Sequence, residues 1–291
     1  MTTTESKIIP RATLEPQWHV PGAKEPGYIR YLINWVGGPE GHINPNKSVA
    51  AISEQAVVGL MHLPVGQKQK GIHYHSVAEI YIILRGELEG YDGNGHITRA
   101  GPLDCMYIPA GVPHGVRNCG VEDCDLIWVH DGVERIGTSV YYFDGETPTI
   151  PQLDEISIIP FAQLDPNYIC YKAKEPDLQR WVVNWVGGPG EYTNFNPDTA
   201  VTSDKVAIGM TILLPGQQSV LHSHTTPETY LVVRGRGFLH LKGETHELSE
   251  LDGAYIVQGE LHYIQNHGQD PLYILWVHDQ PELSEATKYI P

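Results

Sequence analysis

The sequence predicts an all-β protein made of two tandem β-barrels, and three observations support this prediction. Short runs rich in β-branched and aromatic residues alternate with turns that contain Gly or Pro. No segment keeps a helical period over three turns. The chain also repeats itself at an offset of about 150 residues, so both halves should adopt the same fold.

The repeat covers nearly the whole chain. Residues 8–16 are echoed by 158–166, and the sequence Asn-Trp-Val-Gly-Gly-Pro occurs at 34–39 and again at 184–189. The offset then falls from 150 to 149 and finally to 148, which two single-residue deletions explain. We therefore expect two domains, residues 1–148 and 149–291, joined by a stretch that contains Pro and acidic residues.

Strands can be placed in order along the first half. They are expected at 57–63, before a Pro-containing turn, at 79–85, which stops at a Gly, and at 106–108 and 125–129. The sequence Tyr-Asp-Gly-Asn-Gly at 91–95 predicts a hairpin turn. Short strands with regular turns are typical of a sandwich or a barrel.

Composition excludes several classes of partner. At 291 residues, 41% apolar and 19% charged, the chain has the size and composition of two globular domains. A formal net charge of −16 argues against binding to nucleic acid or to an anionic membrane surface. The start lacks the apolar core of a signal peptide, and no apolar run has transmembrane length. The four cysteines match no zinc motif and are expected to be free thiols, which is typical of a cytoplasmic protein. Since nucleic acid and membranes are disfavoured, we expect the partner to be a small molecule.

A group of potential metal ligands stands in the first half. Because strand side chains alternate, His73 and His75 should point to the same face, and Glu79 has the same parity. His114 follows the Pro- and Gly-containing turn at 109–113, which could bring it back to the group. Three imidazoles and one carboxylate are a ligand set for a divalent metal.

The second half repeats this set with the same spacing, as His222, His224, Glu228 and His262. Isolated histidines are more often packed or solvated than ligating, but two matching sets make that interpretation poor. We predict up to two divalent transition metals per chain. Four protein ligands leave positions open on a six-coordinate ion, which favours Fe or Mn, with Ni, Co or Zn possible.

Further polar residues share the strand face of the two motif glutamates. A Tyr two residues later and an Arg six residues later have the same parity in both halves and should point into the barrels. The Tyr could be an acid, a base or a hydrogen-bond donor, and the Arg could bind a carboxylate. The alternatives are a core Tyr and an Arg at a strand end. The candidate catalytic residues are Tyr81, Arg85, Tyr230, Arg234 and Glu260, the last on the turn before His262, where a solvated role is the alternative.

These motifs resemble the two cupin motifs in both halves. The first half matches with Gly66, His73, His75, Glu79, Gly86, Pro109, Gly111, His114 and Asn118, and the second with Gly216, His222, His224, Glu228, Gly235, Gly259, His262 and Asn266. The chain thus resembles a bicupin, which implies two jelly-roll-like barrels with a metal site in each. It departs from the pattern by one extra residue between Gly66 and His73, and by Val257-Gln258 in place of Pro-x; no ligand is changed.

The resemblance leaves three function classes open. The first is a metal-dependent dioxygenase that cleaves a C–C bond in a small aromatic or enolisable carbonyl substrate. The second is a redox-neutral lyase, isomerase, decarboxylase or hydrolase, with Tyr81 or Tyr230 as general base. The third is a non-enzymatic binding or storage cupin, which the intact ligand sets disfavour. We expect the dioxygenase.

Three narrower expectations follow. The stretch 73–79 is similar to the motif of oxalate decarboxylases, but Lys70-Gly71-Ile72 replaces their usual Arg-Glu lead-in, which disfavours oxalate as substrate. The first half should carry the chemistry, because Pro109-Ala110-Gly111 fixes the turn that positions His114. A homodimer is also expected, because apolar strand edges favour association.

Overall fold

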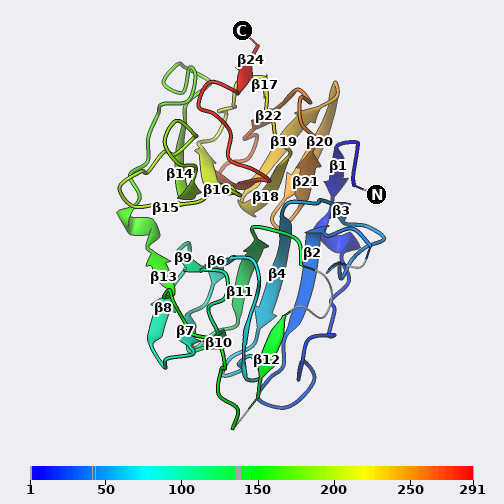
Figure 1. Cartoon of the computed structure of the whole chain (residues 1–291). Coiled ribbons are helices and arrows are strands. Elements are labelled where there is room, and N and C mark those ends of the chain that lie inside the picture. The colour runs from blue at the N-terminus through cyan, green and yellow to red at the C-terminus, as the bar shows by residue number, and fades with distance from the viewer. Residues whose placement is uncertain (1, 41, 43, 135–138, 144, 291) are drawn as a thin grey trace. The chain divides into compact units, whose positions relative to one another are not determined.

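The computed structural model describes residues 2–40, 42, 44–134, 139–143 and 145–290. Within these residues the regular secondary structure is almost entirely β-strand, apart from two 3-10 turns, η1 (Arg11–Thr13) and η2 (Phe161–Gln163). Four sheets are divided between two compact units, which confirms the predicted all-β fold with two barrels (Figure 1).

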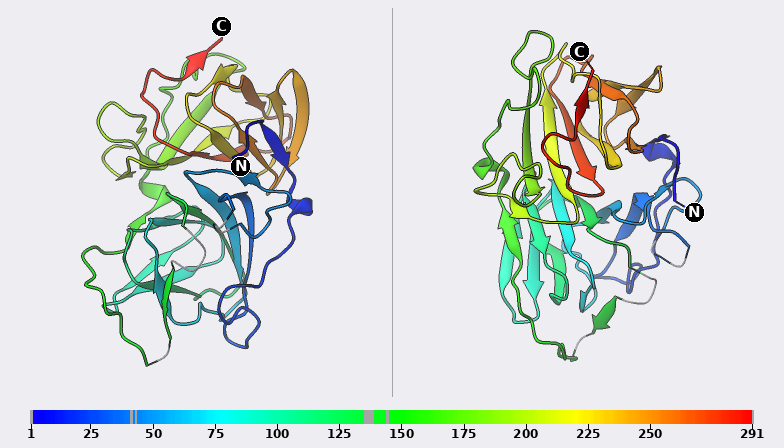
Figure 2. Two further views of the ribbon diagram at one scale, coloured as in Figure 1. Left: turned by 45° about the vertical axis from the view of Figure 1, so that its right-hand side comes forward. Right: turned by 45° about the horizontal axis from the view of Figure 1, so that its top comes forward.

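The first unit contains a seven-stranded and a five-stranded sheet (Figure 2). The larger sheet has the order β13 (Ser157–Ile159), β9 (Cys105–Ile108), β6 (Glu79–Arg85), β11 (Cys124–His130), β4 (Val57–Leu63), β2 (Tyr31–Gly37) and β3 (Ala51–Ile52). The smaller has the order β12 (Val140–Tyr142), β5 (Ile72–Tyr74), β10 (His114–Asn118), β7 (Leu88–Asp92) and β8 (Ile97–Ala100). The four strands expected from the sequence and the hairpin turn between β7 and β8 are all present.

The core of the first unit lies between its two sheets. It combines Met61, Ile83 and Trp128 from the larger sheet with Leu88 and Val116 from the smaller. Each of these side chains is at most 4% exposed. Burial of apolar side chains on facing strands is the main force that holds two such sheets together.

The second unit repeats this architecture. Its larger sheet has the order β1 (Lys7–Ile9), β21 (Gly253–Ile256), β18 (Glu228–Arg234), β23 (Leu272–His278), β16 (Ala207–Leu213), β14 (Arg180–Gly187) and β15 (Val201–Thr202). Its smaller sheet has the order β20 (Glu244–Ser249), β19 (Arg236–Leu241), β22 (His262–Gln265), β17 (His222–Ser223) and β24 (Lys288–Tyr289). The core again draws on both sheets, with Val232 and Trp276 from one and Leu239 and Ile264 from the other.

The compact units are divided differently from the predicted limits at 148 and 149. The first comprises Met1–Thr2 and Leu14–Ala162, and the second Thr3–Thr13 and Gln163–Pro291. The leading strand of each repeat causes the difference, because β1 pairs with β21 and β13 pairs with β9. A three-residue strand is held in place by the strand it pairs with, and its own sequence does not show which strand that is. The limits 1–148 and 149–291 stay a prediction about the duplicated sequence.

Two further features concern the cysteines and the helices of the described chain. All four cysteines are free thiols, and burial raises the pKa of Cys124 to about 12 and that of Cys105 well above its usual value. Among the described helices, none has the length and apolar character needed to cross a membrane.

Gly59 offers a test of the packing behind the first core. It lies on β4 opposite Trp128 of β11, and a Cβ atom there would clash with the Trp128 indole ring and the Ile33 carbonyl oxygen. We expect Gly59→Ala to lower the free energy of unfolding by about 1–3 kcal/mol. Thermal unfolding followed by circular dichroism measures this as a lower melting temperature. Gly101→Ala is the control, because its Cβ would meet only Asp104 Oδ2 at 3.7 Å; an equal loss in both variants would contradict the packing argument.

Candidate metal centres

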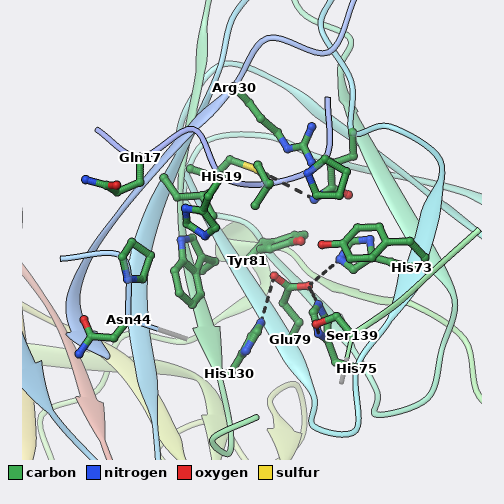
Figure 3. Close-up of a pocket in the computed structure, with 18 residues that line it drawn as sticks. Gln17, His19, Arg30, Asn44, His73, His75, Glu79, Tyr81, His130 and Ser139 are labelled. Atoms are coloured by element: carbon green, nitrogen blue, oxygen red, sulfur yellow. Dashed lines mark hydrogen bonds and ion pairs between the residues drawn. The ribbon is translucent and has the colours of Figure 1, made fainter. Parts of the chain in front are cut away.

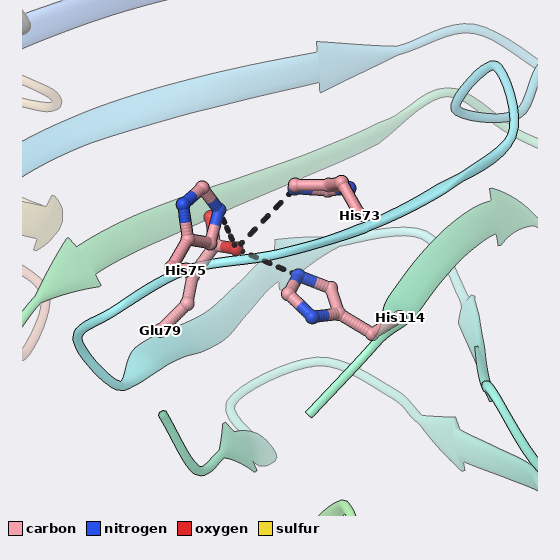
Figure 4. A group of neighbouring side chains, drawn as sticks. All are labelled: His73, His75, Glu79 and His114. Atoms are coloured by element: carbon pink, nitrogen blue, oxygen red, sulfur yellow. Dashed lines mark hydrogen bonds and ion pairs between the residues drawn. The ribbon is translucent and has the colours of Figure 1, made fainter. Parts of the chain in front are cut away.

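The first predicted ligand set converges in the structure (Figure 4). His73 lies on β5, Glu79 begins β6 and His114 begins β10, where it pairs directly with His73. The Oε2 atom of Glu79 lies 3.9 Å from Nε2 of His73, 3.2 Å from Nε2 of His75 and 2.9 Å from Nε2 of His114. One ligand atom from each of the four lies within 4.8 Å of the others, and all four residues are buried.

The second set has the same arrangement. His222 lies on β17, Glu228 begins β18 and His262 begins β22, opposite His222. Oε2 of Glu228 lies 3.4 Å from Nε2 of His224 and 3.1 Å from Nε2 of His262. The four ligand atoms again lie within 4.8 Å of one another. The structure thus brings together each set of four that the sequence predicted.

Hydrogen bonds at the outer ring nitrogens set the tautomers. Nδ1 of His114 donates to the Val112 carbonyl over 2.8 Å, and Nδ1 of His75 donates to the Glu134 carboxylate over 2.7 Å. In the second half the equivalent bonds run from His262 to Glu260 O and from His224 to Glu282, and His222 also donates to Val220 O. With these protons on Nδ1, the neutral form of each imidazole has its lone pair on the inner Nε2, beside an anionic carboxylate. Such a donor set fits a divalent cation.

The electrostatics suit ligation. Burial, followed by the neighbouring His114 and His75, holds the pKa of His73 well below its usual value, and His222 is affected in the same way. Burial disfavours the charged form of Glu79, but the neighbouring His75, His114 and His130 outweigh it and hold its pKa well below the usual range. Ligands of this kind must be a neutral imidazole and an ionised carboxylate.

The two His-x-His pairs differ at their second histidine. Burial opposes the charged form of His75, but the Glu79 and Glu134 carboxylates prevail and raise its pKa to about 9. Burial prevails at His224, whose pKa is lowered. At neutral pH His75 must therefore lose a proton before it can ligate, whereas His224 is already neutral.

Two acidic residues that sequence reasoning missed support the clusters. Oε2 of Glu134 accepts hydrogen bonds from Nδ1 of His75 and, over 3.2 Å, from the Ser139 hydroxyl, while Oε1 accepts from the backbone N–H and the hydroxyl of Ser76. Glu282 makes the matching bonds to His224, Thr225 and Thr287 in the second half. The signal was present in the sequence, because His-Asp-x-x-Glu occurs at 130–134 and again at 278–282.

The histidines of this repeated segment also belong to the sites. His130 Nε2 lies 3.4 Å from Oε1 of Glu79, and His278 Nε2 lies 3.1 Å from Oε1 of Glu228. Each therefore holds the carboxylate oxygen that faces away from the ligand histidines. Neither was among the candidate site residues predicted from the sequence.

Tyr81 and Tyr230 line the two sites, as their strand parity predicted. Burial, and then the charge of Glu79, raises the pKa of Tyr81 well above its usual value, and Tyr230 is shifted in the same way beside Glu228. The Tyr230 hydroxyl lies 3.5 Å from Nε2 of His262. Both phenols therefore remain protonated at neutral pH, so they can donate hydrogen bonds but do not suit the role of general base.

Three of the candidate catalytic residues do not point into the sites. Two of them are Arg85 and Arg234, for which the predicted inward orientation was wrong. The Arg85 side chain is 51% exposed and pairs with Asp125 over 2.6 Å, and the exposed Arg234 lies over the ring of Tyr273. The reason is a register shift near the end of β6 and of β18, which breaks the alternation that parity assumes.

Glu260 is the third residue to be corrected. Its carboxylate lies 3.9 Å from the Lys242 ammonium and does not line the second cavity. Its backbone carbonyl accepts the Nδ1–H of His262, so the residue acts on the site through its main chain.

The cavities beside the two clusters differ in size. The first, of about 450 Å³, reaches His73, His75 and Glu79 (Figure 3), whereas the second has about 80 Å³. Phe195 lines the second cavity and packs on Trp276 with ring centroids 6.0 Å apart. The equivalent position in the first half is Pro45, which leaves that space open.

Comparisons with known proteins agree with the repeated fold. The model of the cupin domain matches residues 59–130 and 209–278. An oxalate decarboxylase of Lactobacillus farciminis in a formate complex has a TM-score of 0.65 and 16% identity, over 100% of this chain and 89% of that one. A mutant oxalate decarboxylase of Bacillus subtilis has a TM-score of 0.62 and 17% identity, over 100% of this chain and 81% of that one. At such identities the likeness concerns the fold alone.

One curated relative has a sequence similar to part of the chain. An uncharacterized protein of Methanocaldococcus jannaschii is 33% identical over 87 residues, which are 30% of this chain and 70% of that protein.

Proposed function

Because the chain belongs to the cupin family and has two cupin domains in tandem, we propose that it is a metal-dependent enzyme whose chemistry takes place in the first domain. The observation that carries this proposal is the cavity of about 450 Å³ beside the first cluster. Sites that bind small organic molecules have volumes of about 300–1,000 Å³. The second cavity, with about 80 Å³, falls short of that range, so we assign its cluster a structural or auxiliary role.

The residues present would hold one divalent ion in each cluster, through His73, His75, Glu79 and His114 and through His222, His224, Glu228 and His262. Such an ion supplies a Lewis acid that polarises a carbonyl or stabilises an enolate. Fe or Mn is our first candidate, because four protein ligands leave coordination positions for substrate. Ni, Co and Zn are the alternatives.

The rest of the first site can orient a substrate. Tyr81, which is 1% exposed, presents a protonated phenol, and Gln69 and Ser139 add polar groups to the cavity wall. Leu32, Met61 and Trp128 form an apolar portion of the same wall. A substrate with both a polar and an apolar part fits such a lining.

We propose C–C bond cleavage as the reaction, with dioxygen as co-substrate and a small aromatic or enolisable carbonyl compound as substrate. Apart from Glu79, the described lining residues of the first cavity include no carboxylate, and the Tyr81 pKa is unsuited to a base. Four protein ligands leave positions on the ion for both substrate and dioxygen, which favours an oxygenase, whereas the neutral imidazole of His19 in the cavity wall is the base that redox-neutral chemistry would use. Redox-neutral decarboxylation is the second candidate, favoured by the shared fold of the oxalate decarboxylases.

Metal analysis and gas exchange test the proposal. The purified protein should bind up to two divalent ions per chain, and chelation should abolish turnover of any substrate found in a panel of carbonyl compounds and phenols. An oxygenase consumes dioxygen in proportion to product and stops without it, whereas a decarboxylase releases carbon dioxide anaerobically. Turnover that survives complete removal of the metal would overturn the assignment. The homodimer and the cytoplasmic location stay predictions.

A further inference from the structure

A buried arginine faces the first cavity. Arg30 immediately precedes β2, and only 2% of its surface is exposed. It lines the same cavity as His73 and Tyr81, and Figure 3 shows its guanidinium together with His73 in the cavity wall. Arg30 was not among the residues predicted from the sequence, because it precedes the strand and belongs to neither motif.

The charge of Arg30 is poorly compensated. Its side chain donates one long hydrogen bond, from Nη1 to the Tyr28 carbonyl over 3.4 Å. Within the described part of the chain, no carboxylate forms an ion pair with it. A guanidinium carries five N–H donors and stays protonated in proteins, so burial without an anion is unfavourable. Burial indeed lowers the pKa of Arg30.

The second half contains a matched arginine that is satisfied by the chain itself. Arg180 stands 150 residues after Arg30 and is 4% exposed. It donates to the Leu178 carbonyl over 3.0 Å and to the Tyr171 carbonyl over 2.8 Å. The repeat places Pro21 at the position of Tyr171 in the first half, and no hydrogen bond to it compensates Arg30. The arginine with fewer partners therefore faces the larger cavity.

We propose that Arg30 binds the carboxylate of the substrate, and that the first domain acts on carboxylates with an apolar body. An arginine fork binds a carboxylate through two parallel hydrogen bonds, which supplies the missing counter-charge. Val20, Leu32, Met61 and Trp128 provide apolar wall for the rest of the molecule. A cavity of about 450 Å³ has far more room than a two-carbon acid needs. The inference rests on the proposed function in placing the substrate in the first domain.

Binding to the metal-loaded protein, kept without dioxygen and followed by calorimetry, tests this inference independently of turnover. The probes are phenylacetate, phenylacetamide, which lacks the charge, and acetate, which lacks the apolar body. Wild-type protein should bind phenylacetate more tightly than either of the others. Arg30→Met should weaken phenylacetate binding by about 10- to 150-fold, the range expected for a hydrogen bond to a charged group, and should hardly change phenylacetamide binding. Arg30→Lys keeps the charge but lacks the fork, so its affinity for phenylacetate should lie between those of wild type and Arg30→Met.

Arg85→Met is the matched control, because it removes an exposed arginine of the same domain that pairs with Asp125. It should leave phenylacetate binding within about twofold. Unchanged phenylacetate binding in Arg30→Met would overturn the proposal, as would equal binding of phenylacetate and phenylacetamide by wild-type protein. The second comparison decides the matter even if the Arg30 variants do not fold. Turnover of an uncharged substrate would refute this inference and leave the proposed function intact. Tight carboxylate binding without turnover of any substrate would refute the proposed function and leave the carboxylate site intact.

Discussion

Glu79→Gln is expected to lower turnover by about 100-fold or more. The substitution keeps the size of the side chain but removes the only carboxylate of the first ligand set, whose Oε2 lies within 3.9 Å of three imidazole nitrogens. Loss of a residue that merely supports a ligand costs about 10- to 100-fold in metal affinity or activity, so loss of a ligand should reach at least the upper end. Metal content per chain and steady-state turnover should fall together.

Glu228→Gln is the paired measurement. It removes the equivalent carboxylate in the second half and should release the second metal, but turnover should stay within about twofold of wild type because the second cavity has only about 80 Å³. Circular dichroism must show that both variants fold. Loss of turnover in Glu228→Gln alone would move the chemistry to the second domain, and loss in both would show that the two sites act together.

The sequence predicted the ligand sets because their geometry is local. His73, His75 and Glu79 lie within seven residues, on β5, directly after it and at the start of β6, so one short segment brings them together, and a turn signal announces His114. The same period failed at Arg85, where the ladder between β6 and β11 shifts register. A bulge is a property of paired strands, and nothing in the sequence of one strand reveals it.

Residues that reach the site across the fold could not be predicted in this way. Glu134 contacts His75 from 59 positions along the chain, and Arg30 enters the cavity from the residue before β2. The exchange of β1 and β13 between units likewise depends on which sheet edge a short strand joins. Only the repetition of His-Asp-x-x-Glu at 130–134 and 278–282 gave an indirect signal for one of these contacts.

A second physical property, the size of the cavity, now favours the first domain as the place of the chemistry. The sequence favoured that half because a proline pins the turn before His114. The structure adds the size of the cavity, which Pro45 lines where Phe195 lines the smaller cavity of the second domain. The contrast between Pro45 and Phe195 was visible in the repeat, but its meaning needed the positions of both side chains relative to the clusters.

Glu134→Gln is expected to weaken metal binding at the first site by about 10- to 100-fold while leaving all four ligands in place. The Glu134 carboxylate accepts the Nδ1–H of His75 over 2.7 Å, which keeps the lone pair on Nε2 and makes the imidazole a stronger donor. A neutral amide can accept the same hydrogen bond but lacks the charge. Glu282→Gln should have the matching effect on the second site only, since Glu282 contacts His224.

The acid dependence of stability supplies a second measurement on the same variants. Burial opposes the charge of Glu134, but the hydrogen bond from His75 prevails and lowers its pKa from 4.5 to about 2. A carboxylate with a lowered folded-state pKa stabilises the native protein above the unfolded-state value, and this contribution is lost as the pH falls from about 4.5 towards 2. Metal-free Glu134→Gln should therefore lose less stability than metal-free wild type across that interval.

Unchanged metal affinity at the first site, measured by competition with a chromophoric chelator, would contradict the role assigned to Glu134. If Glu282→Gln weakened the first site as much as Glu134→Gln does, the effect would reflect a general loss of stability and not support of His75.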